Sequence, residues 1–305
     1  MEYLLLIVGI ALLVVGGDFL VKSALGLANK FNISPLLIGI TIVSFGTSAP
    51  ELIVSLQATL EGNPGIAIGN ILGSNIANIG LVLGLTVSLR SVYINRRKYF
   101  TSWLVMLISS LMFYGFSLDG QISKIEGLFF VAGLLAFITI SISSLSKEHS
   151  SNDSKTSMHP AMILLFFLLG SSGLYFGSEL LIANAVEIAY SIGVSEFVIG
   201  ATVVALGTSL PELATSLIAS IRGQNSISIG NLLGSNVFNI FAVLGITSLV
   251  QPIPVDIFLL YVDLPVMIGI VIMLGLFMFI GKKIGVIEGV ALITAYVMYI
   301  FYSLF

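Results

Sequence analysis

Long runs of apolar residues, separated by short polar stretches, dominate the chain. A run of about 20 residues is the length that a helix needs to cross the hydrocarbon core of a bilayer. The pattern therefore predicts ten spans and an all-α integral membrane protein. The spans cover about 4 to 28, 35 to 60, 65 to 88, 99 to 117, 125 to 145, 161 to 183, 196 to 221, 226 to 250, 257 to 280 and 285 to 304.

The composition agrees with a membrane protein and excludes other classes. Of the 305 residues, 57% are hydrophobic and 9% are charged, and the mean hydropathy is +1.11, whereas soluble domains carry about 25% charged residues. The net charge of -3 is small, so no nucleic-acid partner is predicted. No cysteine is present, and both histidines, His149 and His159, lie in one polar loop. Zinc and copper sites within the spans are therefore not expected.

The start of the chain leads straight into apolar residues. It has no basic leading segment and no small-residue cleavage site, so we interpret the first span as a retained helix and not as a signal peptide. No phosphate-binding loop of the type found in ATPases occurs, which argues against an ATP-driven pump.

The second half of the chain repeats the first at a constant offset, which is 161 residues from Glu51 to Glu212. The hexad Gly46 to Glu51 (GTSAPE) returns as Gly207 to Glu212 (GTSLPE), and the register continues without a gap into the next span. We infer a duplication. It divides the chain into a first repeat at 1–145, a polar cytoplasmic linker at 146–160 and a second repeat at 161–305.

The distribution of Lys and Arg predicts the orientation, because these residues concentrate in short cytoplasmic loops. With the N-terminus outside, only Lys124 lies on the outer side. The other eleven lie on the cytoplasmic side: Lys22, Lys30, Arg90, Arg96, Arg97, Lys98, Lys147, Lys155, Arg222, Lys282 and Lys283. Because each repeat has an odd number of spans, the repeats are inverted, an arrangement typical of secondary transporters. Both termini are predicted to be extracellular, in the cell membrane.

The two hexads place acids and hydroxyls inside apolar spans. Pro50 lacks an amide hydrogen and crowds the preceding turn, so we expect a helix break near 44 to 49 whose free carbonyls face a cation. After the break, Thr47, Ser48 and Glu51 project toward one side. The equivalent residues of the second hexad are Thr208, Ser209 and Glu212.

The span after each hexad supplies neutral oxygens. Ser74 and Asn78 lie four residues apart on one helix face, as do Ser235 and Asn239. Glycines at a spacing of four residues in this span favour close helix packing. Carboxylate, amide, hydroxyl and carbonyl oxygens form the ligand set that Ca²⁺ prefers. The two glutamates balance one Ca²⁺, and equally two monovalent ions or two protons, so competition for one site predicts exchange.

These motifs resemble the alpha repeats of the cation/calcium exchanger superfamily, in its prokaryotic sodium/calcium exchanger branch. The resemblance rests on the two GTSxPE hexads, each followed by G-N-x-x-G-S-N-x-x-N, and covers nearly the whole chain. It implies a ten-helix inverted-repeat antiporter with broken helices 2 and 7, in which the first span of each half slides past the rest. Ca²⁺ and Na⁺ are the implied substrates, with no cofactor and no obligate protein partner. The implied ligands are the residues above together with backbone carbonyls near Ser44, Thr47, Ala205 and Thr208.

One position departs from the family pattern. Well-known exchangers carry an aspartate at one of the two positions occupied here by Asn78 and Asn239. The double asparagine argues against potassium dependence and leaves Glu51 and Glu212 as the only acids of the predicted shell.

Other interpretations stay open at this point. A proton-coupled calcium exchanger would use the same glutamates, and a cation channel or an intramembrane enzyme fits the sequence less well. Asn78 and Asn239 also fit a role in helix association, and we expect Asn70, Asn75, Asn231 and Asn236 mainly to pack or stabilise helices. Asp18 and the equivalent Glu179 are either acids that reach water or a basic side chain, or gating residues.

Overall fold

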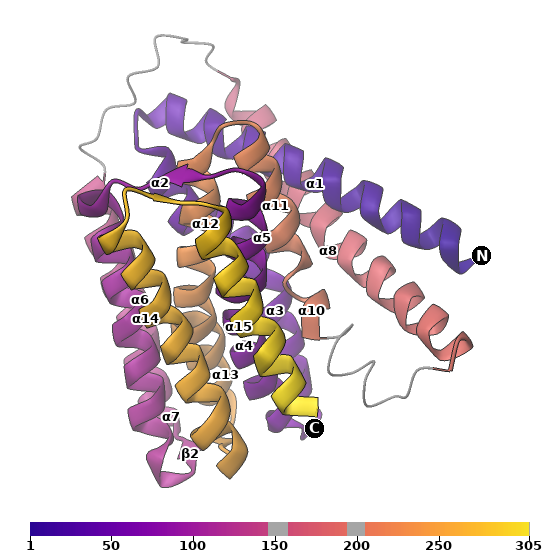
Figure 1. Ribbon diagram of the computed structural model, residues 1–305, viewed down its shortest axis with the longest axis vertical. Coiled ribbons are helices and arrows are strands. Elements are labelled where there is room, and N and C mark those ends of the chain that lie inside the picture. Colours follow the sequence, from indigo (N-terminus) through magenta and orange to yellow (C-terminus); the bar gives the residue numbers. More distant parts are fainter. Residues whose placement is uncertain (146–157, 194–204, 305) are drawn as a thin grey trace.

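The computed structural model describes residues 1–145, 158–193 and 205–304 (Figure 1). Nearly all of them are helical. The first half contains α1 (Glu2–Phe31), α2 (Pro35–Ile38), the π-helical η1 (Gly39–Val43), α3 (Ser44–Leu60), α4 (Pro64–Ala77), the π-helical η2 (Asn78–Leu83), α5 (Gly84–Leu89), α6 (Arg96–Phe116), the 3-10 helix η3 (Ser117–Asp119) and α7 (Lys124–Leu145). The second contains α8 (Pro160–Ser191), α10 (Ala205–Gly207), α11 (Leu210–Ile221), α12 (Asn225–Phe238), the π-helical η5 (Asn239–Leu244), α13 (Gly245–Val250), the π-helical η6 (Leu259–Asp263), α14 (Leu264–Ile280) and α15 (Val286–Leu304).

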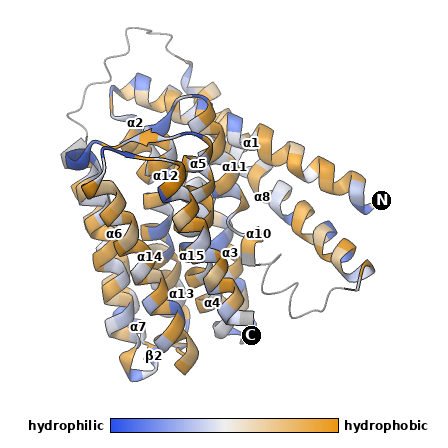
Figure 2. Ribbon diagram, viewed as in Figure 1, coloured by the Kyte–Doolittle hydropathy of each residue, from blue (hydrophilic) through white to orange (hydrophobic). Residues whose placement is uncertain are grey.

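The described residues contain nine helical spans long and apolar enough to cross a membrane. They confirm nine of the ten predicted spans. The remaining one, 196 to 221, lies partly outside the described residues, and its described part consists of α10 and α11. The linker at 146–160 also lies mostly outside them. Large apolar side chains such as Ile7, Leu128 and Val297 are exposed along the helices, and Figure 2 shows that hydrophobic residues predominate along most of the helices. This is the surface expected of a protein whose solvent is lipid.

Two short antiparallel sheets join the halves at opposite ends of the bundle. β1 (Val92–Tyr93) pairs with β4 (Lys283–Ile284), and β2 (Gln121–Ile122) pairs with β3 (Ile253–Pro254). β3 is the repeat equivalent of β1, yet it lies at the other end of the bundle, next to β2, which Figure 1 shows where α6 and α7 meet. The two halves are therefore inverted relative to each other, as the Lys and Arg distribution predicts.

The hexad helices α3 and α11 end in the same way. Gly62 and Gly223, which are repeat equivalents, have φ of +85° and +78°, a conformation that glycine adopts without strain. The next amide donates back across the helix end, from Asn63 to Ala58 O and from Gln224 to Ala219 O, both at 2.8 Å. Repeated sequence thus produces repeated local structure.

The predicted break at 44 to 49 is present in only one half. In the second half, a turn at Thr208 and Ser209 separates α10 from α11, and Pro211 starts the new helix. In the first half, α3 continues through 44 to 49 with Pro50 inside it, and the irregular segment is instead η1, immediately upstream. The predicted position of the first break was therefore wrong. Pro50 removes only one backbone hydrogen bond, and α3 tolerates this loss and continues through the proline.

The long helices α1 and α8 lie side by side and extend away from the other helices (Figure 1). Glycines allow their backbones to touch. A Cβ atom on Gly16 would lie 2.8 Å from Leu174 N, and one on Gly9 would lie 3.0 Å from Gly177 O. Gly9 and Gly170 are repeat equivalents, as are Gly16 and Gly177, so the contact obeys the symmetry of the duplication.

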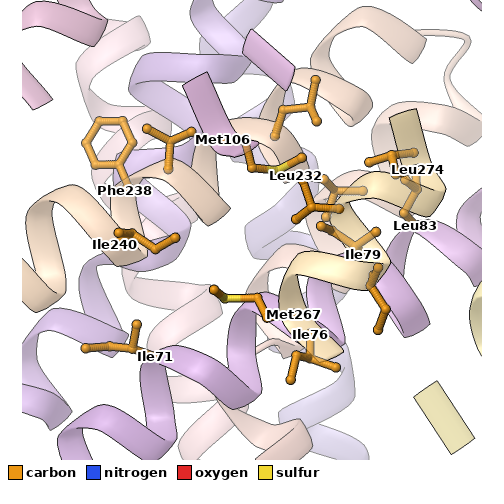
Figure 3. Packing of buried hydrophobic residues seen from close by; sticks show 14 of the residues in the cluster. Ile71, Ile76, Ile79, Leu83, Met106, Leu232, Phe238, Ile240, Met267 and Leu274 are labelled. Carbon is orange, nitrogen blue, oxygen red and sulfur yellow. The ribbon is translucent and has the colours of Figure 1, made fainter. Parts of the chain in front are cut away.

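The main hydrophobic core surrounds α12, which is buried on every side. Ile71, Ile79, Leu232, Met267 and Leu274 are each at most 1% exposed, and Figure 3 shows them packed between helices of both halves. This cluster of buried side chains includes residues of η2 and η5, whose first residues are the predicted ligands Asn78 and Asn239.

Candidate cation site

Glu51 and Glu212 are fully buried, and the exposed fraction of each residue is 0%. Glu51 lies on α3 and Glu212 lies in the first turn of α11. Ser48, three residues before Glu51, donates to Glu212, so the two acids belong to one buried polar cluster. Burying two charges in this way is costly unless a cation or protons compensate them.

The two carboxylates differ in their hydrogen bonds. Glu212 Oε1 accepts from Ser48 Oγ and from Ser235 Oγ, each at 3.2 Å. Glu212 Oε2 and both carboxylate oxygens of Glu51 have no hydrogen-bond partner among the described residues. A buried carboxylate oxygen without a donor is rare and points to a bound ion, water or proton. Three such oxygens in one place are the strongest indication of a cation site in this structure.

Hydroxyl groups connect the hexad of each half to the following span of the other half. Thr47 Oγ1 lies 3.2 Å from Ser235 Oγ, and Thr208 Oγ1 lies 3.0 Å from Ser74 Oγ. Because these pairs are repeat equivalents, the site has the approximate twofold symmetry of the duplication. Thr47 also donates to the side-chain oxygen of Asn231 at 3.1 Å.

Asn78 and Asn239 begin the π-helical segments η2 and η5. Both residues are 0% exposed, and within the part of the chain that the structure describes neither the nitrogen nor the oxygen of either amide has a hydrogen-bond partner. An asparagine that held helices together would donate or accept a bond across the interface, and these do not. Short π-helical segments often occur at functional sites, because the wider turn releases backbone groups.

The other predicted ligands take different positions. Ser44 Oγ donates to Gly39 O at 2.8 Å and to Asn231 O at 2.9 Å, so this hydroxyl supports the packing of η1 against α12, while its carbonyl accepts from Thr47 at 3.3 Å. Ser209 Oγ is buried without a partner. Ala205 begins α10 just before the break.

The structure confirms the expected packing roles of Asn70 and Asn231. Asn70 Nδ2 donates to Ser55 Oγ at 3.0 Å, and Asn231 Nδ2 makes the equivalent bond to Ser216 Oγ at 3.1 Å. Asn231 does more, since its side-chain oxygen also holds Thr47.

Sequence reasoning missed one buried acid. Asp263, at the end of η6, is 6% exposed, and its Oδ1 has no partner. The signal was an aspartate within the predicted apolar span 257 to 280.

A large apolar cavity of about 560 Å³ reaches the edge of the site. Its walls come from α1, η1, α3, α7, α8 and the η5 region, and only Thr41 and Ser48 contribute polar side chains. A hydrated cation would lose its water in such a space without replacement ligands. Among the described residues, the cavity therefore offers a cation few ligands besides Ser48 and Thr41.

Comparisons with known proteins agree with this arrangement. A sequence profile of the family described as Sodium/calcium exchanger protein matches residues 1–143 and 162–305. The chain is 31% identical to the sodium/calcium exchanger MaX1 of Methanosarcina acetivorans, covering 98% of this chain and 97% of that protein. It is 35% identical to the putative antiporter CaxA of Alkalimonas amylolytica, covering 96% and 95%. A solved structure of the sodium-calcium exchanger NCX_Mj superposes with a TM-score of 0.86 at 32% identity, covering 98% of this chain and 97% of that one.

Proposed function

Because this chain belongs to the sodium/calcium exchanger protein family, we propose that it exchanges Na⁺ for Ca²⁺ across a membrane at a site built around Glu51 and Glu212. The observation that carries the proposal is the pair of fully buried carboxylates, three of whose four oxygens have no partner. The relatives MaX1 and NCX_Mj are both named as sodium/calcium exchangers, which supports the same function.

The oxygens around the two glutamates match the needs of the proposed substrates. Ca²⁺ takes about 6–8 oxygen ligands and tolerates irregular geometry. Two carboxylates, the amide oxygens of Asn78 and Asn239 and the unpartnered hydroxyl of Ser209 supply such a set. Further ligands are the hydroxyls of Thr47, Thr208, Ser48, Ser74 and Ser235 and backbone oxygens near Ser44 and Ala205. No group of three or more acidic or histidine side chains lies together in the described residues, so neutral oxygens must complete the shell.

Charge balance explains why transport is coupled in this proposal. The two glutamates carry a charge of -2, which one Ca²⁺ or two Na⁺ neutralise. An empty site would leave two buried charges that repel each other. This repulsion disfavours the closed conformation through which the transporter must pass between its two open states when no ion is bound. Loaded crossings in both directions produce exchange and prevent leak.

The inverted repeat provides the means of alternating access. Helix α1 packs against α8, its repeat equivalent, through glycines, and both are long helices that extend away from the remaining bundle. Two equivalent halves of opposite orientation can exchange conformations, and this opens the central site to one side and then to the other. We place both termini outside the cell and the linker at 146–160 in the cytoplasm, with 1–145 and 161–305 as the two repeats.

Transport in proteoliposomes tests the proposal directly. Vesicles containing the purified protein are loaded with Na⁺, diluted into Na⁺-free buffer of equal pH and supplied with labelled Ca²⁺. We expect Ca²⁺ uptake that collapses when Na⁺ is equal on both sides and is absent in protein-free vesicles. Uptake that ignores the Na⁺ gradient would refute sodium coupling, and uptake that needs no ion on the opposite side would indicate a channel.

A proton-coupled calcium exchanger is the second candidate. It is favoured by one observation, which is that Glu51 lacks any hydrogen-bond donor, so that a proton could take the place of a metal ion there. The same vesicles decide between the two functions. Uptake that follows an imposed pH gradient in the absence of Na⁺, and does not respond to Na⁺, would replace the first proposal by the second.

A further inference from the structure

A cluster of charged residues fastens α1 to the carboxyl end of α11. The Asp18 carboxylate on α1 lies 2.8 Å from Lys22 Nζ on the same helix and also contacts the guanidinium of Arg222, which follows α11. Arg90, which follows α5, donates from Nη1 to two carbonyl oxygens of the last turn of α11, at 2.9 and 2.8 Å. Cations at a helix carboxyl end are favourable because they interact with its free carbonyls.

Apolar packing supports the same contact. A Cβ atom on Gly17 of α1 would lie 2.8 Å from Ile218 Cδ1 and 3.3 Å from the carbonyl carbon of Ala214. The two helices thus touch one turn before the ion pair. The end of the helix that carries Glu212 is closed by α1 in the state described here.

The repeat equivalents of this cluster have the wrong charges to form the same contact. The equivalent of Asp18 is acidic, and so is the equivalent of Arg222, whereas the equivalents of Arg90 and Lys22 are neutral. In the same order, these equivalents are Glu179, Glu61, Gln251 and Ala183. The inverted arrangement would bring a carboxylate on α8 toward a carboxylate at the end of α3.

The α8 and α3 end is not joined in this structure. Glu179 accepts a hydrogen bond from Tyr175 of its own helix at 2.9 Å, and Glu61 accepts one from Gln57 of its own helix at 2.9 Å. Ile53, the equivalent of Ala214, is 50% exposed. The structure is therefore closed at one end of the pseudo-symmetric pair and not at the other.

We propose that the Asp18–Arg222 ion pair is a latch that favours the state described here over its inverted counterpart. This inference rests on the alternating access proposed above. In the counterpart state, α8 closes over α3 as α1 now closes over α11, and Glu179 meets Glu61 with no cation between them. The two end states of this transporter are then unequal, because one gains an ion pair and the other gains a repulsion.

The expected effect is moderate, because the pair is partly exposed. The side chains of Asp18 and Arg222 are 21% and 42% exposed, and such pairs change an equilibrium constant by about two- to five-fold. Loss of the latch should therefore shift the balance between the two states without unfolding the protein. A replacement of Glu61 by a basic residue should shift it in the same direction, by adding an attraction to the other end.

Thiol labelling measures the shift, since the chain has no cysteine of its own. An Ile218→Cys variant places one thiol under α1, and its rate of modification by a small maleimide in proteoliposomes reports opening of this end. In that background, Asp18→Asn and Arg222→Gln should each raise the rate about two- to five-fold. The double variant Asp18→Asn with Arg222→Gln should label no faster than the faster single variant, because both changes remove the same ion pair, and Glu61→Arg should raise the rate with the latch intact. Glu187→Gln, an exposed acid on α8 remote from the cluster, serves as the matched control and should leave it unchanged.

An unchanged labelling rate in Asp18→Asn and Arg222→Gln would overturn the latch, and so would a double variant in which the two single effects multiply, because independent effects would mean that the two residues do not act as a pair. Should Arg222→Gln fold poorly, Arg222→Lys keeps the charge and must label slowly if the inference holds. The labelling assay needs no transport. A latch effect without Na⁺-driven Ca²⁺ uptake would refute the proposed exchange alone, whereas exchange without a latch effect would refute this inference alone.

Discussion

Replacement of Glu51 by glutamine should produce two opposite effects, weaker calcium binding and a more stable ion-free protein. The structure gives the reason for both. Glu51 is fully buried and neither of its carboxylate oxygens accepts a hydrogen bond, so without a cation its charge is uncompensated. With a cation bound, the same charge supplies half of the protein's balancing charge.

The size of each effect follows from this environment. Removing one member of a buried charge pair costs about 3–5 kcal/mol, so the dissociation constant for Ca²⁺ should rise at least about 100-fold. The ion-free protein loses a buried group without a partner, and the new amide can donate toward the free oxygen of Glu212, so we expect a gain of about 1–3 kcal/mol in the free energy of unfolding.

Two measurements on purified protein in detergent test the pair of effects. Calorimetric titration with Ca²⁺ in Na⁺-free buffer gives the affinity, and thermal unfolding with and without a chelator gives the stability. The wild-type protein should be protected by Ca²⁺, by about 2.7 kcal/mol at 100 times its dissociation constant, and Glu51→Gln should not. Glu187→Gln is the matched control. Wild-type calcium affinity in Glu51→Gln, or a less stable ion-free protein, would show that Glu51 is not a ligand but a structural acid.

Three further outcomes are expected. Ser48→Ala removes one of the two donors to Glu212 and should weaken Ca²⁺ binding about 10-fold or more. In unfolding assays of the ion-free protein, Ser48→Ala should also lose more stability than Ser209→Ala, because the Ser209 hydroxyl has no partner among the described residues. Equal losses of stability in the two variants would contradict this. Gly16→Leu forces a side chain into the backbone of α8 and should abolish exchange in vesicles, while Gly115→Leu, where a Cβ meets no atom within 4 Å, should retain it. Gly62→Ala strains a residue at φ +85° and should lower the unfolding free energy by about 1–2 kcal/mol, measured by thermal unfolding.

Most of the helical architecture could be predicted from the apolar runs, because a bilayer requires each spanning segment to satisfy its own backbone. The pairing of the two hexads was visible from the repeat alone. The π-helical segments at Asn78 and Asn239 were not predictable, since no side-chain pattern separates them from an α-helix of similar composition. The proline rule placed a break in α3, but the structure has the break only in the second half, between α10 and α11. Tertiary packing therefore decides how a single missing bond is absorbed.

Contacts distant in the sequence were the other limit. Asp18 was recognised as an intramembrane acid, but its partner Arg222 lies in the other half and no spacing rule connects the two. The bond from Thr47 to Asn231 was hidden for the same reason, because both residues were already explained by their own helices.

The hydrogen bonds at the centre of the site show how one sequence motif can serve two states. Glu212 receives its two bonds from Ser48 and Ser235, whereas the equivalents of these donors, Ser209 and Ser74, do not bond to Glu51. Ser209 has no partner, and Ser74 is bonded to Thr208 instead. The donors that Glu51 lacks are therefore present in the chain and differ only in arrangement. Under the alternating access proposed above, an exchange of conformations between the halves would transfer the two bonds from Glu212 to Glu51, and the carboxylate without donors would then be Glu212.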